Sequence, residues 1–179
     1  MSLPTQSIVV VSKIDPAWRD YNGHLNYAAY AMAADPAVDA IYAAAGLDLT
    51  YRKRFDRSDY VVESRFIYLK EIRSDGSIEV RARLVGFDRK RTHIYCEIRD
   101  PGKNWLSAVA HIVSLHVDTA LARSAEFENF ALERFAAIKA GHDQLPPPDI
   151  FDDTVTLARR FPRSKSIPES QSSSPRGNG

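Results

Sequence analysis

Residues 19–45, RDYNGHLNYAAYAMAADPAVDAIYAAA, join a polar loop to a long alanine-rich segment. Residues 27–45 contain no glycine, and alanine has the highest helix propensity of all residues, so this segment predicts a long helix. Pro36 lies inside it. Either the helix kinks at this proline, or Asp35 caps a second segment that has Pro36 at its first position. Gly46 is expected to end the helix.

Strand patterns lie on both sides of the predicted helix. β-Branched side chains mark the stretch before it. Of the four stretches after it, two alternate apolar and charged side chains, as half-buried strands do, and two are apolar over more of their length. The connections between these four are short, so consecutive strands are expected to pair antiparallel. The expected strands are residues 7–14, 60–72, 76–87, 91–99 and 104–117.

The order of elements predicts the fold class. A charged connecting loop is expected at residues 48–58 and a closing helix at residues 126–143. One long helix against one large antiparallel sheet is a two-layer α+β arrangement. We expect this domain to span residues 1–145, and residues 146–179, which are rich in proline and serine, to form a disordered C-terminal tail.

The composition limits the class of protein. A chain of 179 residues suffices for one well-buried domain. Because 24 Lys+Arg face 23 Asp+Glu, neither nucleic acid nor a membrane surface is an expected partner. The single cysteine, Cys96, excludes an internal disulfide and fits a reducing compartment. The N-terminal residues lack the features of a signal peptide, and no apolar run reaches the ~18 residues that span a bilayer. A cytoplasmic protein is expected.

Familiar catalytic motifs and metal-ligand pairs are missing from the sequence. It has no glycine-rich loop for phosphates or dinucleotides, and no serine elbow of the α/β-hydrolase kind. His111 and His116 point to opposite faces of one predicted strand, as do His93 and Cys96 on another. We therefore expect no metal site and no cofactor.

Polar residues gather just before the predicted helix: Asp20, Asn22, Gly23, His24 and Asn26. The first N–H groups of a helix lack intrahelical partners and the helix dipole favours negative charge, so a carbonyl group can be polarised there. Gly23 lets the backbone approach a ligand, and Asp20 can attack an activated carbonyl or deprotonate a water. Alternatively, Asp20 and Asn22 only cap the helix and stabilise the loop.

The segment DYNGHLNYAAY resembles the active-site segment of hotdog-fold acyl-CoA thioesterases of the 4-hydroxybenzoyl-CoA thioesterase type. Those proteins carry an Asp, then G-H-x-N and an aromatic residue, where the chain enters a long central helix. The resemblance covers about residues 5–120 and implies a hotdog fold, an antiparallel five-stranded sheet wrapped around one long central helix. It implies that Asp20 is the nucleophile or general base and that the Tyr27 N–H donates to the thioester oxygen. Asp35 matches an acid that the family often carries farther along the helix.

A closer resemblance is to the thioesterases of carnitine breakdown, which are proposed to hydrolyse betainyl-CoA. It rests on IDPAWRDYNGHLN, YVVESRFIYLKEIR, DRKRTHIYCEIRD and SLHVD. It implies hydrolysis of an acyl-CoA thioester to a free acid and CoA, so that CoA is part of the substrate. His24 would then be either a hydrogen-bond partner that orders the loop around Asp20 or a general acid, and Asn26 would cap the helix or hold the loop. Pro36, inside the helix, and His111, in place of an expected acid, depart from the pattern.

Aromatic residues near the loop suit such a substrate. A quaternary ammonium cannot donate a hydrogen bond and is best held by aromatic faces. The rings form either such a cage, with Trp18 and Tyr21 as its main members, or a packing layer between helix and sheet. The candidates are Trp18, Tyr21, Tyr27 and Tyr30.

Charged residues are candidates for the rest of the substrate. The phosphates of CoA need fixed positive charge. The candidates to supply it are Arg89, Lys90 and Arg91 at a turn, or residues 52–54 in a loop. Alternatively, both clusters are only solvated surface charges. Glu63 lies on a strand face from which it can reach a partner's active site or pair with an arginine.

The edges of the predicted sheet bear on the oligomeric state, and two functions other than hydrolysis remain as alternatives. Exposed edges are usually covered, and members of the resembled family pair edge to edge, so at least a homodimer is expected, either a homodimer or a dimer of dimers. One alternative function is a hotdog lyase or dehydratase, in which a histidine and an acid activate a carbon–hydrogen bond. The other is a non-catalytic hotdog protein that binds an acyl-CoA or a partner.

Overall fold

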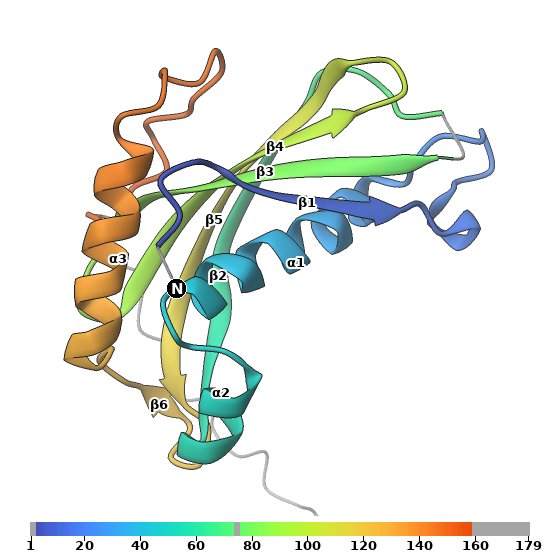
Figure 1. Ribbon diagram of the computed structural model, residues 1–179. Helices are drawn as coiled ribbons and strands as arrows, with labels where there is room; N and C mark the ends of the chain where they lie inside the picture. The colour runs from blue at the N-terminus through green and yellow to red at the C-terminus, as the bar shows by residue number, and fades with distance from the viewer. Residues whose placement is uncertain (1–2, 74–75, 159–179) are drawn as a thin grey trace, which may run out of the picture.

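The computed structural model describes residues 3–73 and 76–158 (Figure 1). The chain forms β1 (Ile8–Lys13), the short 3-10 helix η1 (Pro16–Trp18), α1 (Tyr27–Ala44) and α2 (Leu49–Phe55). The strands β2 (Arg57–Tyr68), β3 (Ser77–Phe87), β4 (Arg91–Asp100) and β5 (Trp105–Asp118) follow. The two-residue strand β6 (Arg123–Ser124) precedes α3 (Asn129–His142). The five long strands and both long helices expected from the sequence are confirmed.

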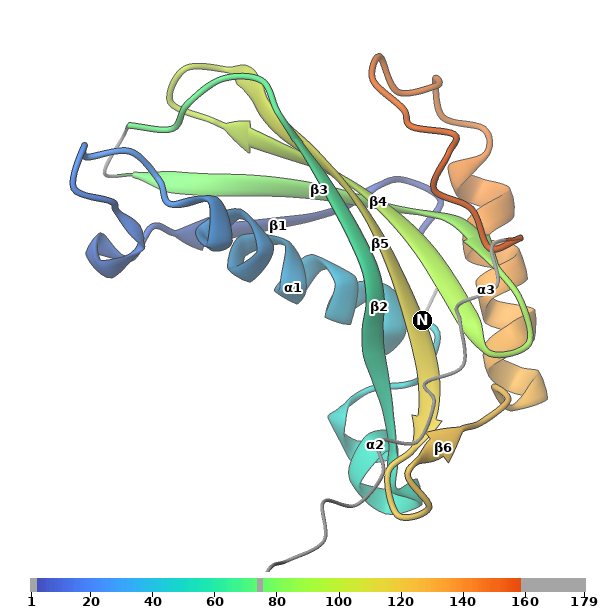
Figure 2. The same ribbon diagram turned by 180° about the vertical axis from the view of Figure 1, so that it is seen from behind.

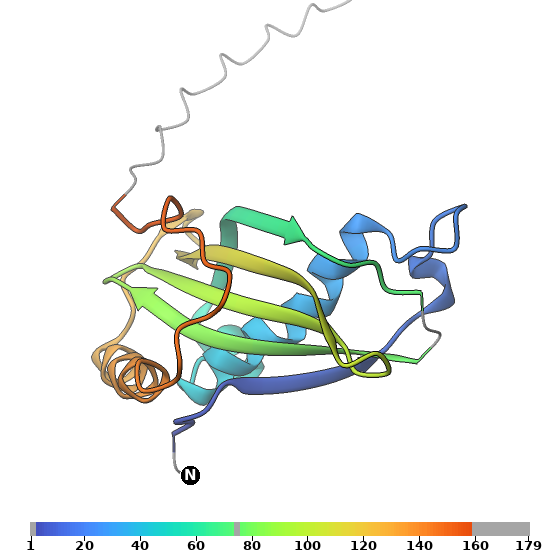
Figure 3. The ribbon, with the colours of Figure 1, turned by 90° about the horizontal axis from the view of Figure 1, so that it is seen from above.

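The strands form one antiparallel sheet in the order β1-β3-β4-β5-β2, and β6 pairs with the end of β5. The sheet curves around α1, which lies along its concave face (Figures 1, 2 and 3). Apolar side chains from α1 and from the inner positions of the strands are buried together in one core. The expected fold, a five-stranded antiparallel sheet wrapped around one long helix, is confirmed.

The pairing expected for the first two strands after the helix is wrong. β2 pairs with β5 and forms an edge of the sheet, whereas β3 lies between β1 and β4. Because β1 already occupies the free side of β3, the connection after β2 carries the chain across the end of the sheet instead of turning back on itself (Figure 3). The expected pairings of β3 with β4 and of β4 with β5 are confirmed.

The sequence of α1 explains its bounds. The side chain of Asn26 caps the helix by accepting a hydrogen bond from the Ala28 N–H at 2.9 Å. One helix continues through Pro36, so the alternative of a second segment capped by Asp35 is wrong. Pro36 is on the exposed side, where water can satisfy the carbonyl that loses its helical partner. Gly46 ends the helix with a φ of 86°, as expected.

The charged loop expected at residues 48–58 is also wrong, because most of it forms α2. Asp48 caps this helix by accepting a hydrogen bond from the Tyr51 N–H at 2.8 Å. The Tyr51 ring is buried, so the short helix is held by packing as well as by its cap. Arg52 is also largely buried and pairs with Asp39 and Asp59, whereas the other positions of α2 face solvent.

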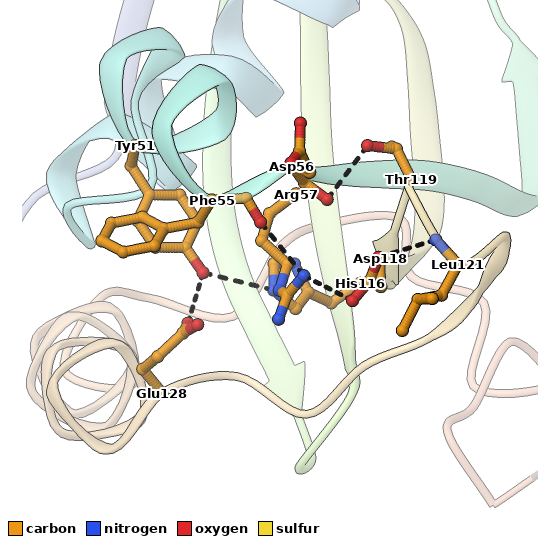
Figure 4. A network of polar contacts seen from close by, with 9 residues as sticks. All are labelled: Tyr51, Phe55, Asp56, Arg57, His116, Asp118, Thr119, Leu121 and Glu128. Atoms are coloured by element: carbon orange, nitrogen blue, oxygen red, sulfur yellow. Dashed lines mark hydrogen bonds and ion pairs between the residues drawn. The ribbon is translucent and has the colours of Figure 1, made fainter.

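A polar network fixes α2 to the rest of the domain (Figure 4). The Tyr51 hydroxyl donates to the Glu128 carboxylate and lies 3.5 Å from His116 Nε2 on β5. Burial and the neighbouring Glu128 carboxylate raise the pKa of Tyr51, so its hydroxyl stays protonated and remains a donor. Arg57 and Asp118 form a second link at 2.7 Å between the ends of β2 and β5.

Residues 145–158 cover the face of the sheet that points away from α1 (Figure 3). The Tyr95 hydroxyl donates to the Ile150 carbonyl at 2.8 Å, and the Asp152 N–H donates to His111 Nε2 at 3.1 Å. This cover explains why β4 is buried on both faces rather than half-exposed.

The cover lies within the segment that was expected to be a tail. Residues 146–158 of that segment pack on the sheet, and Val155 is buried there. The remainder of the expected tail, residues 159–179, lies outside the described residues.

Candidate active site

The loop before α1 is a tight hydrogen-bonded hairpin closed by Asp20. Its Oδ1 accepts from the Asn22 N–H at 2.9 Å and from the His24 N–H at 3.0 Å. The Asp20 N–H donates to the His24 carbonyl at 2.9 Å, and the Gly23 N–H donates to the Asp20 carbonyl at 3.0 Å. Gly23 has a φ of 76°, a conformation that other residues rarely adopt. These loop bonds use one carboxylate oxygen of Asp20. The expected loop-stabilising role of Asp20 is therefore compatible with a catalytic role.

The first turn of α1 offers a backbone donor beside this loop. The Asn26 side-chain oxygen accepts a hydrogen bond from the Ala28 N–H, and the Asn26 backbone carbonyl accepts one from the Ala29 N–H at 2.9 Å. The expected capping role of Asn26 is confirmed. The first N–H groups of a helix have no partner inside it, and the described part of the chain supplies no acceptor for that of Tyr27. This donor also carries the positive end of the α1 dipole.

Asp20 and Tyr27 both line one pocket of about 330 Å³, which we call the Asp20 pocket. His24 Nε2 lies 3.2 Å from the Glu71 carboxylate, which ties the loop to the segment after β2. His24 therefore orders the loop through its side chain as well as its backbone. The lining includes Asp20, His24, Tyr27, Tyr30, Tyr68 and Glu71.

The structure brings together only some of the expected aromatic residues. Tyr27 and Tyr30 line the Asp20 pocket. Trp18 instead packs partly buried against the core, and Tyr21 is 97% exposed. The cage expected to be built mainly from Trp18 and Tyr21 is therefore not assembled in this chain, and Tyr68 occupies the wall of the pocket in their place.

Sequence reasoning missed Tyr68. Its ring meets that of Tyr30 edge to face, with centroids 5.1 Å apart, and its hydroxyl donates to the Tyr27 carbonyl at 3.4 Å. Burial raises the pKa of both Tyr30 and Tyr68. Tyr68 lies on an edge strand far along the chain from the helix, and only the pairing of β2 with β5 places it beside α1. A possible signal was that Tyr68 and Phe66 share one strand face.

A separate pocket, of about 340 Å³, lies farther along α1 and β2. Asp35, which matched the family's acid by resemblance, lines it together with Asp59. Burial raises the pKa of Asp59 to about 6, although the Arg52 guanidinium lies 2.7 Å away. Burial also raises the pKa of Asp35. Three acids, Asp35, Asp39 and Asp59, line this second pocket beside Arg52, whereas three tyrosines line the Asp20 pocket.

The other expected binding residues lie away from the Asp20 pocket within one chain. Arg89 and Lys90 lie in the β3–β4 turn and Arg91 begins β4. The Arg89 guanidinium is paired with Glu126 at 2.6 Å. The turn lies near α3, at the other end of the sheet from the beginning of α1 (Figure 1).

Two residues lie on the sheet face that points away from α1. The strand register places Glu63 beside Val113, on the same face as His93. His111 is buried there and lies 3.0 Å from His93. The departure from the family pattern at His111 therefore does not touch the Asp20 pocket in one chain.

Among the described residues, no group of three or more His, Cys, Asp or Glu side chains is placed to hold a metal ion. None of the helices in the same residues is both long and apolar enough to cross a membrane. Cys96 is fully buried, and burial raises the pKa of its thiol to about 12, so it stays a protonated core residue.

A carboxylate and a free helix N-terminal donor around one pocket form an arrangement that can activate a carbonyl group and deliver a nucleophile to it. On a sheet wrapped around one helix, this arrangement defines a hotdog thioesterase. The chain belongs to the Thioesterase-like superfamily, whose family model matches residues 14–135.

Named relatives and solved structures agree with this family. The chain is 38% identical over 134 residues to the betainyl-CoA thioesterase of Pseudomonas aeruginosa, covering 75% of this chain and 84% of that protein. It is 29% identical over 141 residues to the L-carnitine dehydrogenase/betainyl-CoA thioesterase of Rhizobium meliloti, covering 79% of this chain but only 28% of that longer protein.

The fold is similar to that of a Staphylococcus aureus protein solved in complex with CoA, with a TM-score of 0.73 and 19% identity over 83% of this chain and 94% of that one. It is similar also to the DHNA-CoA thioesterase of Staphylococcus aureus, with a TM-score of 0.69 and 14% identity over 76% of this chain and 93% of that one.

Proposed function

We propose that the Asp20 pocket hydrolyses an acyl-CoA thioester and that the acyl group is betainyl. The observation that carries the proposal is the shared pocket of the Asp20 carboxylate and the first turn of α1. The relative with 38% identity is named a betainyl-CoA thioesterase, which supports the choice of acyl group.

The reaction follows from these two groups. The thioester oxygen accepts from the Tyr27 N–H, and the α1 dipole stabilises the negative charge that develops on it. Asp20 takes a proton from a water, whose oxygen attacks the carbonyl carbon, or it attacks that carbon directly and the resulting anhydride is hydrolysed. In either course the C–S bond breaks, the CoA thiolate leaves and is protonated, and one water is consumed to give the free acid.

The neighbouring residues hold this geometry. Gly23 permits the turn, His24 links the loop to Glu71, and Asn26 caps the helix that carries the oxyanion donor. We propose that the active protein is at least a homodimer, because β2 leaves a long edge unpaired within the described chain. Arg89, Lys90, Arg91 and Glu63 can then serve the substrate only from a partner subunit.

Thiol release from a panel of thioesters tests the proposal. The panel holds betainyl-CoA, acetyl-CoA, a medium-chain acyl-CoA and an aromatic acyl-CoA. We expect release of free CoA with the highest kcat/KM for betainyl-CoA. Preference for another thioester would replace the acyl group but keep the hydrolase. Measurable CoA binding with no release from any thioester would contradict the hydrolase and favour the non-catalytic alternative.

A further inference from the structure

We infer that the tyrosines of the Asp20 pocket, with Tyr68 as the deciding residue, bind the quaternary ammonium of a cationic acyl group and select it over a neutral group of the same shape. The inference rests on the proposed function for the reaction, but it concerns a binding wall that can be tested without turnover. Tyr68 comes from β2, whereas Tyr27 and Tyr30 come from α1.

Two of the three rings pack together, and Tyr27 lines the same pocket. Tyr30 is only 4% exposed and packs its ring edge to face against Tyr68, which fixes the orientation of the Tyr68 ring. Tyr68 and Tyr27 are 48% and 75% exposed, so ring surface of both remains accessible to a ligand. The Tyr68 hydroxyl donates to the Tyr27 backbone carbonyl at 3.4 Å, which ties Tyr68 to the first turn of α1.

The reach of the acyl group favours this wall over the acidic pocket farther along α1. In a betainyl group the nitrogen is two bonds from the carbonyl carbon, about 2.5 Å with bonds of roughly 1.5 Å. Asp35 lies eight residues beyond Tyr27, which is about 12 Å along a helix axis at 1.5 Å per residue. A thioester held at the Tyr27 N–H therefore places its ammonium near the tyrosine rings and out of contact with Asp35.

The charges around the pocket are compatible with a cation. Asp20 and Glu71 are both part of the lining. Lys70 also lines the pocket, but its ammonium lies 5.0 Å from the centre of the Trp105 ring and forms a cation–π contact with it. Because a quaternary ammonium donates no hydrogen bonds, aromatic faces bind it without leaving a polar group unpaired.

A pair of matched substrates tests the inference. Betainyl-CoA and 3,3-dimethylbutanoyl-CoA have the same shape and differ in the positive charge of one central atom. We expect the wild type to prefer betainyl-CoA in kcat/KM, and Tyr68→Leu to lower that preference about tenfold, the upper part of the range for cation–π contacts. Tyr68→Phe keeps the ring and should keep the preference. Phe55→Leu changes a ring of equal exposure on α2 and should leave it unchanged.

A binding measurement separates this wall from the reaction. Calorimetry with free betaine and with 3,3-dimethylbutanoate needs no turnover, and the wild type should bind betaine more tightly, with the difference lost in Tyr68→Leu. Equal preference in wild type and Tyr68→Leu, in either assay, would overturn the inference even if every thioester is hydrolysed. Betaine binding that depends on Tyr68 in a protein that hydrolyses nothing would support the wall and reject the proposed function.

Discussion

The Asp20 carboxylate and the His24 backbone hold each other at both ends: Oδ1 of Asp20 accepts from the His24 N–H at 3.0 Å, and the Asp20 N–H donates to the His24 carbonyl at 2.9 Å. This exchange closes the turn through Gly23 and fixes the proposed catalytic carboxylate to the loop that precedes α1. The same atoms that stabilise the loop therefore set the direction of the side chain.

Substitution of Gly23 tests whether the turn conformation positions Asp20. A Cβ at this position would meet no atom within 4 Å, so steric clash is not involved, but the φ of 76° strains most L-residues. We expect Gly23→Ala to lower the free energy of unfolding by about 1 kcal/mol. Thiol release should fall more than this stability loss explains.

Gly23→Asn is the matched variant, because asparagine adopts positive φ more readily than alanine. Urea unfolding and thiol release, measured on both variants, check the prediction. Equal losses of activity in the two variants would show that the backbone conformation is not what matters.

The cap of α1 gives a second prediction. Removing the Asn26 side chain leaves the Ala28 N–H without its acceptor, so Asn26→Ala should cost about 1 kcal/mol of stability. Because the Tyr27 N–H is in the same turn, kcat should also fall. Asn26→Ser can still cap the helix and should recover most of both losses. A thermal or urea unfolding curve of Asn26→Ala that matches wild type would contradict the role of this cap.

Local sequence was sufficient for most elements of the fold. Period-two patterns predicted the strands, and alanine content with Gly46 predicted α1 and its end. The pairing of β2 could not be obtained this way, because turn length alone does not reveal that β1 already occupies the side of β3. The helix α2 was missed because seven residues give too short an apolar pattern, of which Tyr51 is the buried member.

The residues of the candidate site also fall into a predicted group and a group that was not predicted. The loop residues are near in sequence, and their cap and hairpin bonds follow from residue type, so they were predicted. Tyr68 depends on a long-range strand pairing and was not. The burial of His93 and Tyr95 on the outer face depends on residues 146–158, whose composition resembles that of a solvated tail.

The buried histidines predict how stability depends on pH. Burial and the neighbouring His111 lower the pKa of His93 to about 4, so His93 is neutral in the folded protein, whereas an unfolded histidine binds a proton near pH 6.5. The unfolded state therefore binds more protons below this pH. This contribution is present above about pH 6.5 and is lost as the pH falls towards 4, by about 2 kcal/mol between pH 7 and pH 5.

Urea unfolding at a series of pH values checks this, with His93→Gln as the variant. Other groups titrate or carry charge in both proteins, so His93→Gln should remove only part of the dependence of the unfolding free energy on pH. They are Arg65 and Asp152 on the same face, and the buried His111, His116 and His142. A pH dependence identical in wild type and His93→Gln would contradict the assignment.

The free edge of β2 predicts the oligomeric state. Val61 on β2 is 54% exposed, and Val9 on the opposite edge strand β1 is 52% exposed, so they form a matched pair. We expect light scattering to give about 40 kDa, twice the chain mass of 20.1 kDa, for the wild type and for Val9→Lys. A charge on the paired edge should repel, so Val61→Lys should give the monomer mass. Dissociation by Val9→Lys alone would place the interface on β1.

The most direct test of the central claim is the rate of CoA release by Asp20→Asn with the preferred thioester. Asparagine retains an oxygen that can accept the loop hydrogen bonds, but it has no charge to activate a nucleophile. We predict a fall in kcat of at least about 100-fold, with CoA binding and the unfolding curve close to wild type. Asp48→Asn, the same change at the cap of α2, should keep full activity. A kcat of Asp20→Asn within a few-fold of wild type would contradict the account.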